Sequence, residues 1–321
     1  LTTTNDHTNS YCVQFGASDY LTTGIDPTET LSQTAHFDPW RSWRRSATPS
    51  NFVCRTESHA QIQPWTNNAQ DLKDQIELMT AGGNTSIDVA VKWASALLDP
   101  SMNEELNALR TISGSNIPSE FSSRPFAYNR EDTLKFIVVM TDGINTTQYD
   151  LVNAYKSGVS NLYRDTATGN LSVRDDEYQD YDGDGDWWED YFIYNLDGVS
   201  GFPTRYWDDE PFDSDGTASG SEAMNLEWPA VWSTMSLSWR AYYMHYRQYW
   251  DADDYYDNIY DPLTWVSAGN KDAYLDDICQ AAKDNNVVIF AVGFEVTDSS
   301  AAVMSDCAST PNHFYRVEGL D

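Results

Sequence analysis

The sequence predicts an α/β fold in which a doubly wound, mostly parallel sheet carries helices on both faces. Continuous apolar runs at 135–140 and 287–294 are typical of parallel strands that are buried on both sides. A shorter strand is expected at 314–317. Helices predicted over 86–99 and 271–286 alternate with these strands, and this alternation indicates a doubly wound domain.

The N-terminal part of the chain gives weaker signals. Residues 1–58 are rich in Thr, Ser, Asn, Asp and Pro, which predicts a long irregular segment that a disulfide ties down. A short strand is expected at 60–63. Apolar residues at helical spacing predict a helix over 71–79, which the glycine pair 82–83 ends.

The helix that follows Thr85 is strongly amphipathic. The Thr85 side chain can cap its start together with Asp88, three residues further on. Its predicted buried residues are Ile87, Ala90, Val91, Ala94, Leu97 and Leu98. The helix over 271–286 is expected to bury Leu275, Ile278, Cys279 and Ala282.

Residues 149–268 interrupt this alternation and are interpreted as an insertion rich in Asp, Tyr and Trp. Within it, apolar and aromatic residues at helical spacing predict one long helix over 225–249. The aromatic residues could form a surface for a glycan or a partner. Because Trp and Tyr at helical spacing more often form a core, we expect most of them to be buried.

The chain is strongly acidic: 19 basic and 50 acidic residues give a formal net charge of −31. This charge repels phosphates, so we expect no nucleic-acid partner and no membrane contact by this chain. It attracts divalent cations, although a solvated surface explains it more simply. No apolar run reaches the roughly 20 residues of a membrane helix. Because the chain begins at Leu1, we expect a processed or truncated product, and any targeting segment would lie upstream.

Four cysteines form no Cys-x-x-Cys pair and have few histidines near them, which disfavours zinc and favours disulfides. Three pairings are possible. Proximity along the chain favours Cys12 with Cys54 and Cys279 with Cys307. Disulfides indicate an oxidising compartment, so we expect an extracellular or periplasmic protein.

Several segments together resemble a known family. They are 80–86 before a helix, the strand 136–140 with Thr141-Asp142-Gly143, and the segments 279–283, 288–294, 307–315, 11–15 and 36–40. These residues are similar to those of TadG-like pilus-assembly proteins, which contain a von Willebrand factor A-type domain. The resemblance covers roughly 1–148 and 270–321.

The resemblance implies a domain plan and a metal site. Residues 59–148 and 269–321 would form the C-terminal part of the A-type domain. In the family, Mg²⁺ is held by an Asp-x-Ser-x-Ser loop, a Thr and an Asp, and here Thr85 and Asp142 match the last two. Hydroxyl and carboxylate oxygens suit a hard cation. The alternative is that Thr85 is only a helix cap and Asp142 only a turn residue.

The Asp-x-Ser-x-Ser loop is absent from this sequence. By the resemblance, the first strand, first helix and second strand are missing too, and they would occupy the middle of the sheet. The fourth strand, 136–140, would therefore have an unpaired edge. We expect an upstream polypeptide or a second chain to complete the sheet and the metal shell.

A second candidate site lies in the insertion. Asp180, Asp182, Asp184 and Asp186 occupy alternate positions, with Tyr181, Gly183 and Gly185 between them, as in a Ca²⁺-binding loop. Position 12 of that loop would be Tyr191 rather than Glu, so Glu189 or Asp190 would have to complete the ligand shell. The alternative is a solvated acidic loop.

No nucleophile, metalloprotease or nucleotide-binding motif is present, and the five histidines are scattered, so we expect no enzyme. The leading hypothesis is a bacterial cell-surface or periplasmic binding or adhesion protein associated with a Tad-type pilus and its surface proteins. One alternative is a structural filament or matrix subunit that uses the A-type fold as a scaffold. A metal-dependent hydrolase is a third hypothesis, for which no nucleophile or open metal site can be named.

Overall fold

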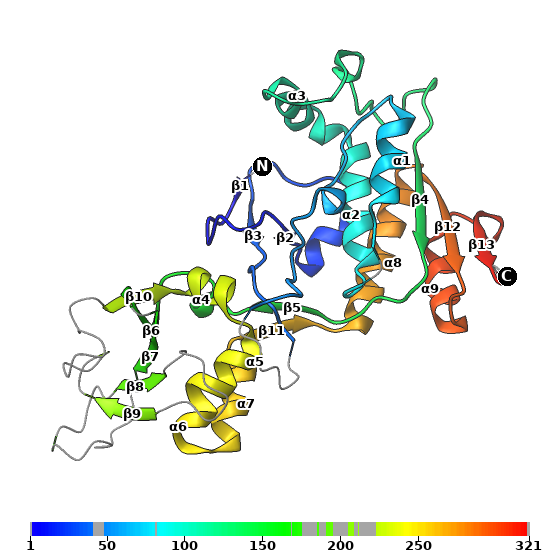
Figure 1. Cartoon of the computed structure of the whole chain (residues 1–321). Coiled ribbons are helices and arrows are strands. Elements are labelled where there is room, and N and C mark those ends of the chain that lie inside the picture. Colours follow the sequence, from blue (N-terminus) through cyan, green and yellow to red (C-terminus); the bar gives the residue numbers. More distant parts are fainter. Residues whose placement is uncertain are drawn as a thin grey trace.

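The computed structural model describes residues 2–40, 48–80, 82–167, 169–174, 185, 191–194, 205–208, 211 and 223–319. These residues form a mixed α/β structure with two hydrophobic cores. One core lies between a parallel sheet and its helices, and the other lies within the insertion, at the lower left of Figure 1. None of the described helices is long and apolar enough to cross a membrane.

The parallel sheet contains three strands in the order β13–β12–β4. Strand β4 (Phe136–Thr141) pairs with β12 (Val288–Phe294), which pairs with β13 (Phe314–Val317), and both pairings are parallel. All three strands were expected from the sequence, and their existence and parallel sense are confirmed.

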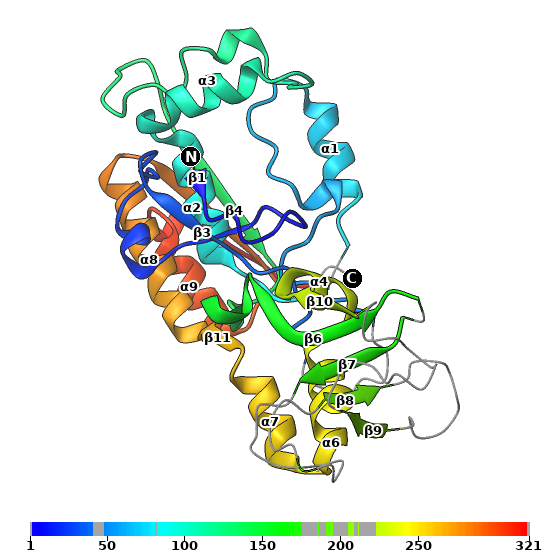
Figure 2. The same cartoon turned by 90° about the vertical axis from the view of Figure 1, so that its left-hand side faces the viewer.

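Helices α2 (Ile87–Leu98), α8 (Ala268–Asp284) and α9 (Asp298–Cys307) cover one face of this sheet. Alternate residues of the strands, such as Ile137 and Ile289, are buried against them. The disulfide Cys279–Cys307 joins α8 to α9, as expected from the sequence. Figure 2 shows these helices to one side of β4.

The other face of β4 is open, which contradicts the expectation of helices on both faces. Phe136, Val138 and Met140 are 49%, 59% and 61% exposed. Among the described residues, no strand pairs with the second edge of β4. Parallel strands normally lie inside a sheet that is covered on both sides. Within the described residues, helices therefore cover only one face of β4.

Helix α1 (Ala69–Glu77) confirms the helix expected over 71–79, but none of its residues is buried. Its apolar residues Ile76 and Leu72 are 63% and 43% exposed, and the helix stands apart from β4 in Figure 2. The strand expected at 60–63 is wrong. A 3₁₀ turn spans Ser58–Ala60 there, and the Gln75 side chain donates hydrogen bonds to nearby backbone carbonyls.

The N-terminal segment is more regular than expected. Strands β1 (Thr2–Thr3), β3 (Thr30–Gln33) and β2 (Val13–Gln14) form a small sheet, and a 3₁₀ helix at Ala17–Leu21 lies between β2 and β3 in the chain. The disulfide Cys12–Cys54 closes this segment, as the sequence indicated. The N-terminal segment is ordered because its apolar side chains pack into the core against α2 and α8. The composition of the segment alone does not reveal this packing.

The insertion builds its own antiparallel sheet. Its order is β10 (Ala223–Glu227), β6 (Val159–Asp165), β7 (Leu171–Arg174), β8 (Tyr191–Tyr194) and β9 (Arg205–Asp208). Strands β5 (Gln148–Leu151) and β11 (Leu263–Val266) pair where the chain enters and leaves it. The remaining helices are α3 (Asn103–Thr111), α4 (Trp228–Thr234), α5 (Leu237–Arg240), a π-helix (Ala241–Tyr246), α6 (Arg247–Tyr249) and α7 (Ala252–Tyr260).

The single long helix expected over 225–249 is wrong. Its first residues belong to β10, and Pro229 lies in the first turn of α4, where its missing N–H is tolerated. Ser236 then caps a new helix by accepting a hydrogen bond from the Trp239 backbone N–H. The expectation of a buried aromatic core is borne out by Trp232 and by Trp239, which are both almost fully buried.

Candidate functional site

Two loops meet near the C-terminal end of β4: residues 84–86 before α2 and residues 141–147 after β4. The Thr146 N–H donates to the Thr85 carbonyl over 3.1 Å, and the Thr146 hydroxyl accepts from the Thr85 N–H over 2.9 Å. The Asn84 amide donates to the Thr147 carbonyl over 3.2 Å. The loops that hold the two predicted Mg²⁺ ligands are therefore locked side by side.

Thr85 does not cap α2, which corrects the expectation from the sequence. Ser86 is at the N-cap position and its side chain makes no capping bond. The first helical N–H, that of Ile87, instead donates to Asn145 Oδ1 over 2.8 Å. Asn145 comes from the other loop, and its amide donates to Asp272 Oδ1 over 3.0 Å.

Asp142 is exposed, and the turn that follows β4 does not depend on it. The Gly143 N–H donates to the Thr141 hydroxyl over 3.1 Å instead. A Cβ added at Gly143 would lie 3.6 Å from Thr85 Oγ1, so the two loops are in contact at this point. Within the described part of the chain, the Thr85 hydroxyl and the Asp142 carboxylate make no hydrogen bond.

A buried lysine lies at the junction of the two loops. Lys271, in the first turn of α8, donates from Nζ to the carbonyls of Thr85 and Thr146 over 2.9 and 3.0 Å. It also donates to the Ser86 hydroxyl and lies 3.7 Å from Asp88 Oδ1. Burial lowers the pKa of Lys271, although the Asp88 carboxylate partly offsets that effect.

Asp88 connects this lysine to the N-terminal segment. It is 1% exposed and accepts a hydrogen bond from the Tyr20 hydroxyl over 3.1 Å. Burial raises the pKa of Asp88, and the neighbouring Lys271 ammonium opposes that rise. Burial, followed by the negative charge of Asp88, raises the pKa of Tyr20. A continuous polar chain therefore runs from the N-terminal segment to the two loops.

Thr85 and Asp142 fit part of a magnesium shell. They offer a hydroxyl and a carboxylate, which are oxygen ligands that a hard cation prefers. Across the described ranges, no three His, Cys, Asp or Glu side chains converge on one point as metal ligands. An octahedral shell needs about six oxygens, so other groups would have to supply the rest.

The candidate Ca²⁺ ligands lie outside the described residues. They are Asp180, Asp182, Asp184, Asp186, Glu189 and Asp190. Gly185, between them, is described and has a φ of 99°, a conformation that glycine adopts without strain. The Ca²⁺ site stays a prediction.

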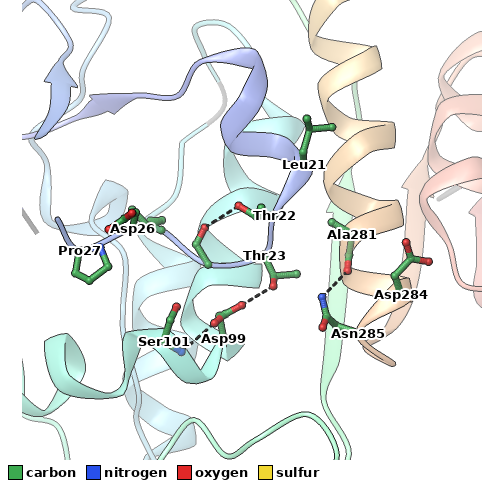
Figure 3. A pocket seen from close by; sticks show the side chains of 12 residues that line it. Leu21, Thr22, Thr23, Asp26, Pro27, Asp99, Ser101, Ala281, Asp284 and Asn285 are labelled. Atoms are coloured by element: carbon green, nitrogen blue, oxygen red, sulfur yellow. Dashed lines mark hydrogen bonds between the residues drawn. The ribbon is translucent and has the colours of Figure 1, made fainter. Parts of the chain in front are cut away.

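An open pocket of about 600 Å³ lies between residues 21–27 and the C-terminal end of α8 (Figure 3). Its lining includes the carboxylate of Asp99, which already accepts hydrogen bonds from the Thr23 hydroxyl and the Ser101 N–H. Asp284 accepts a hydrogen bond from Gln280 in the same way. These carboxylates fix the local structure.

No protein-family model, curated protein or solved structure matches the chain. The site therefore rests on its residues and their geometry. Lys271 and Asn145 were missed by the sequence analysis. The available signal for Lys271 was its position four residues before Leu275, on the apolar stripe of a helix.

Proposed function

We propose that this chain is the C-terminal part of a von Willebrand A-type, TadG-like protein that binds partners without catalysis at the bacterial surface or in the periplasm, in association with a Tad-type pilus. The observation that carries this proposal is the pair of interlocked loops, in which Thr85 Oγ1 lies near Gly143, the residue after Asp142. Within the described residues, neither the Thr85 hydroxyl nor the Asp142 carboxylate makes a hydrogen bond. The two disulfides are compatible with an extracellular or periplasmic location.

In this proposal Thr85 and Asp142 would hold Mg²⁺ beside β4. With one carboxylate and one hydroxyl from this chain, the cation would keep enough charge to accept a carboxylate from an acidic partner. The remaining ligands would come from an Asp-x-Ser-x-Ser loop outside this sequence and from water. The site would thus bind a partner rather than transform it.

The open edge of β4 supports a partner strand. In the part of the chain that the structure describes, no strand pairs with this edge, and the side chains of Phe136, Val138 and Met140 are exposed. Folded proteins normally cover a surface of this kind. A parallel strand added at this edge would end near Asp142, where the missing ligand loop is needed. The upstream polypeptide or a second chain would therefore complete both the sheet and the metal shell.

Magnesium calorimetry on the assembled protein, purified with the polypeptide that precedes Leu1 or with any tightly bound chain, tests this proposal. We expect Mg²⁺ binding that Asp142→Ala weakens at least about tenfold, since it removes the carboxylate that this chain contributes to the site beside β4. Asp132→Ala is the matched control, because Asp132 is an exposed carboxylate near the opposite end of β4. Equal Mg²⁺ affinity in both variants would overturn the assignment.

The same open edge also favours a second candidate function, that of a filament or matrix subunit. In that case another copy of this chain would cover the exposed face of β4, since an unpaired strand edge accepts a strand from any suitable chain. Mass measurements at increasing protein concentration separate the two candidates. Growth into long assemblies supports the filament, whereas a fixed complex with one additional segment supports the binding protein.

A further inference from the structure

We infer that Lys271 is a positioning residue: its buried ammonium holds the loops 84–86 and 141–147 together before any cation binds. The link to cation binding rests on the proposed function. The loop-holding role depends only on the contacts of Lys271 and applies to this chain whatever the loops bind.

The geometry uses every donor that the side chain has. A lysine ammonium carries three N–H groups. In this structure they reach the Thr85 carbonyl, the Ser86 hydroxyl and the Thr146 carbonyl, and the Lys271 side chain is 1% exposed. Two acceptors belong to the first loop and one to the second, so a single charged group ties both loops to α8.

The acceptors around Lys271 resemble the ligand set of a metal ion. Two carbonyls, one hydroxyl and the nearby Asp88 carboxylate are the oxygen types that surround Ca²⁺ in proteins. Here a covalently attached ammonium takes that place. Because it is part of the chain, it orders the loops without a bound ion, and the Asp88 charge balances it in the interior.

This arrangement has a consequence for the adjacent candidate site. If the loops are already ordered, a ligand that contacts Thr85 and Asp142 does not have to supply the free energy that would order them. Without Lys271, the carbonyls of Thr85 and Thr146 would lose a buried charged donor, and the contact between the loops would depend on weaker neutral bonds.

Hydrogen exchange of the 321-residue chain without added metal tests the inference. In Lys271→Met, we expect backbone amides in 84–86 and 141–147 to exchange at least about tenfold faster than in the unmodified chain. The matched control is Lys92→Met, because Lys92 is also buried but donates to carbonyls of the N-terminal segment. That control should leave exchange in the two loops unchanged.

A double variant separates positioning from simple charge balance. Lys271→Met leaves the Asp88 carboxylate buried without its cation, whereas Lys271→Met with Asp88→Asn removes both charges. We expect the midpoint of thermal unfolding of the double variant to return to that of the unmodified chain. The backbone amides of both loops should still exchange as fast as in Lys271→Met. Slow, unchanged exchange of both loops in the double variant would overturn the inference, since Lys271 would then serve only to neutralise Asp88.

The outcome is separable from that of the proposed function. Exchange is measured without any cation, so the role of Lys271 is decided even if Mg²⁺ calorimetry shows no binding. Conversely, Mg²⁺ binding could depend on Asp142 while Lys271→Met leaves the exchange rates of the amides in both loops unchanged. That result would support the metal site and exclude the positioning role of Lys271.

Discussion

A buried ion pair fastens the N-terminal segment to the insertion, and breaking it should be costly. Asp150 on β5 pairs with Lys156, and their side chains are only 3% and 4% exposed. Asp150 Oδ1 also accepts the Ala35 N–H over 2.8 Å, and Lys156 donates to the Gln33 carbonyl over 3.0 Å. One pair therefore holds two backbone groups of the N-terminal segment.

The expected magnitude follows from what remains after Asp150→Ala. The Lys156 ammonium would stay buried without its carboxylate, which costs about 3 to 5 kcal/mol. This is a large share of a typical domain stability of about 5 to 15 kcal/mol. Replacing both residues, with Asp150→Leu and Lys156→Met, removes both charges. That variant should lose only about 1 to 3 kcal/mol, mainly for the Ala35 N–H.

Urea unfolding followed by tryptophan fluorescence measures these differences, because Trp232 and Trp239 lie in the core of the insertion. Asp132→Ala is the control, since Asp132 pairs with Arg130 in an exposed position and should leave the midpoint unchanged. The reasoning is refuted if Asp150→Ala shifts the transition no more than Asp132→Ala does. It also fails if the double variant loses as much as the single one.

Three further predictions concern other sites. Replacing Cys279 and Cys307 by alanine should lower the free energy of unfolding in urea by about 3 to 4 kcal/mol, because the disulfide that joins residues 28 apart no longer restricts the unfolded chain. An unchanged midpoint would contradict this. Burial and then nearby His7 lower the pKa of His36, so the unfolded chain binds its proton more readily and stability should fall as pH drops below 6.5. When the free energy of unfolding is measured over a series of pH values, His36→Phe should show a smaller loss of stability below pH 6.5 than the unmodified chain. Calorimetry should show Ca²⁺ binding that Asp182→Ala with Asp184→Ala abolishes, and no binding by the unmodified chain would indicate a solvated loop.

The sequence predicted the structure best where a local pattern of apolar residues matches the burial of those residues in the fold. The apolar runs of β4 and β12 predicted parallel strands, because strands that are covered on both faces are typically apolar along their whole length. The same reasoning failed for the exposed face of β4, since an apolar run indicates that a surface needs covering and does not show which chain covers it. The insertion was misjudged over 225–249, because aromatic residues at helical spacing also fit a strand followed by separate short helices.

The candidate site was partly predictable for a similar reason. Thr85 and Asp142 stand in recognisable loops. Lys271, in contrast, contacts Thr146, which is 125 residues away in the sequence, and Asn145 contacts Ile87, which is 58 residues away. Long-range pairs of this kind leave little trace in a single sequence. The local sign of Lys271 is a charged residue on the apolar stripe of a helix, which is costly to bury unless a partner in another segment balances it.

The pairing of β5 with β11 determines how easily the insertion could be replaced or shortened. The register pairs Leu151 with Leu263, so the insertion starts and ends at neighbouring points of one antiparallel pair. A module attached through adjacent ends can be lengthened, exchanged or shortened to a turn while the parallel layer keeps its geometry. The constraint on such exchanges comes from the N-terminal segment, because Ala35 and Phe37 pack into the core of the insertion. Any replacement module would have to offer those two side chains a new apolar site.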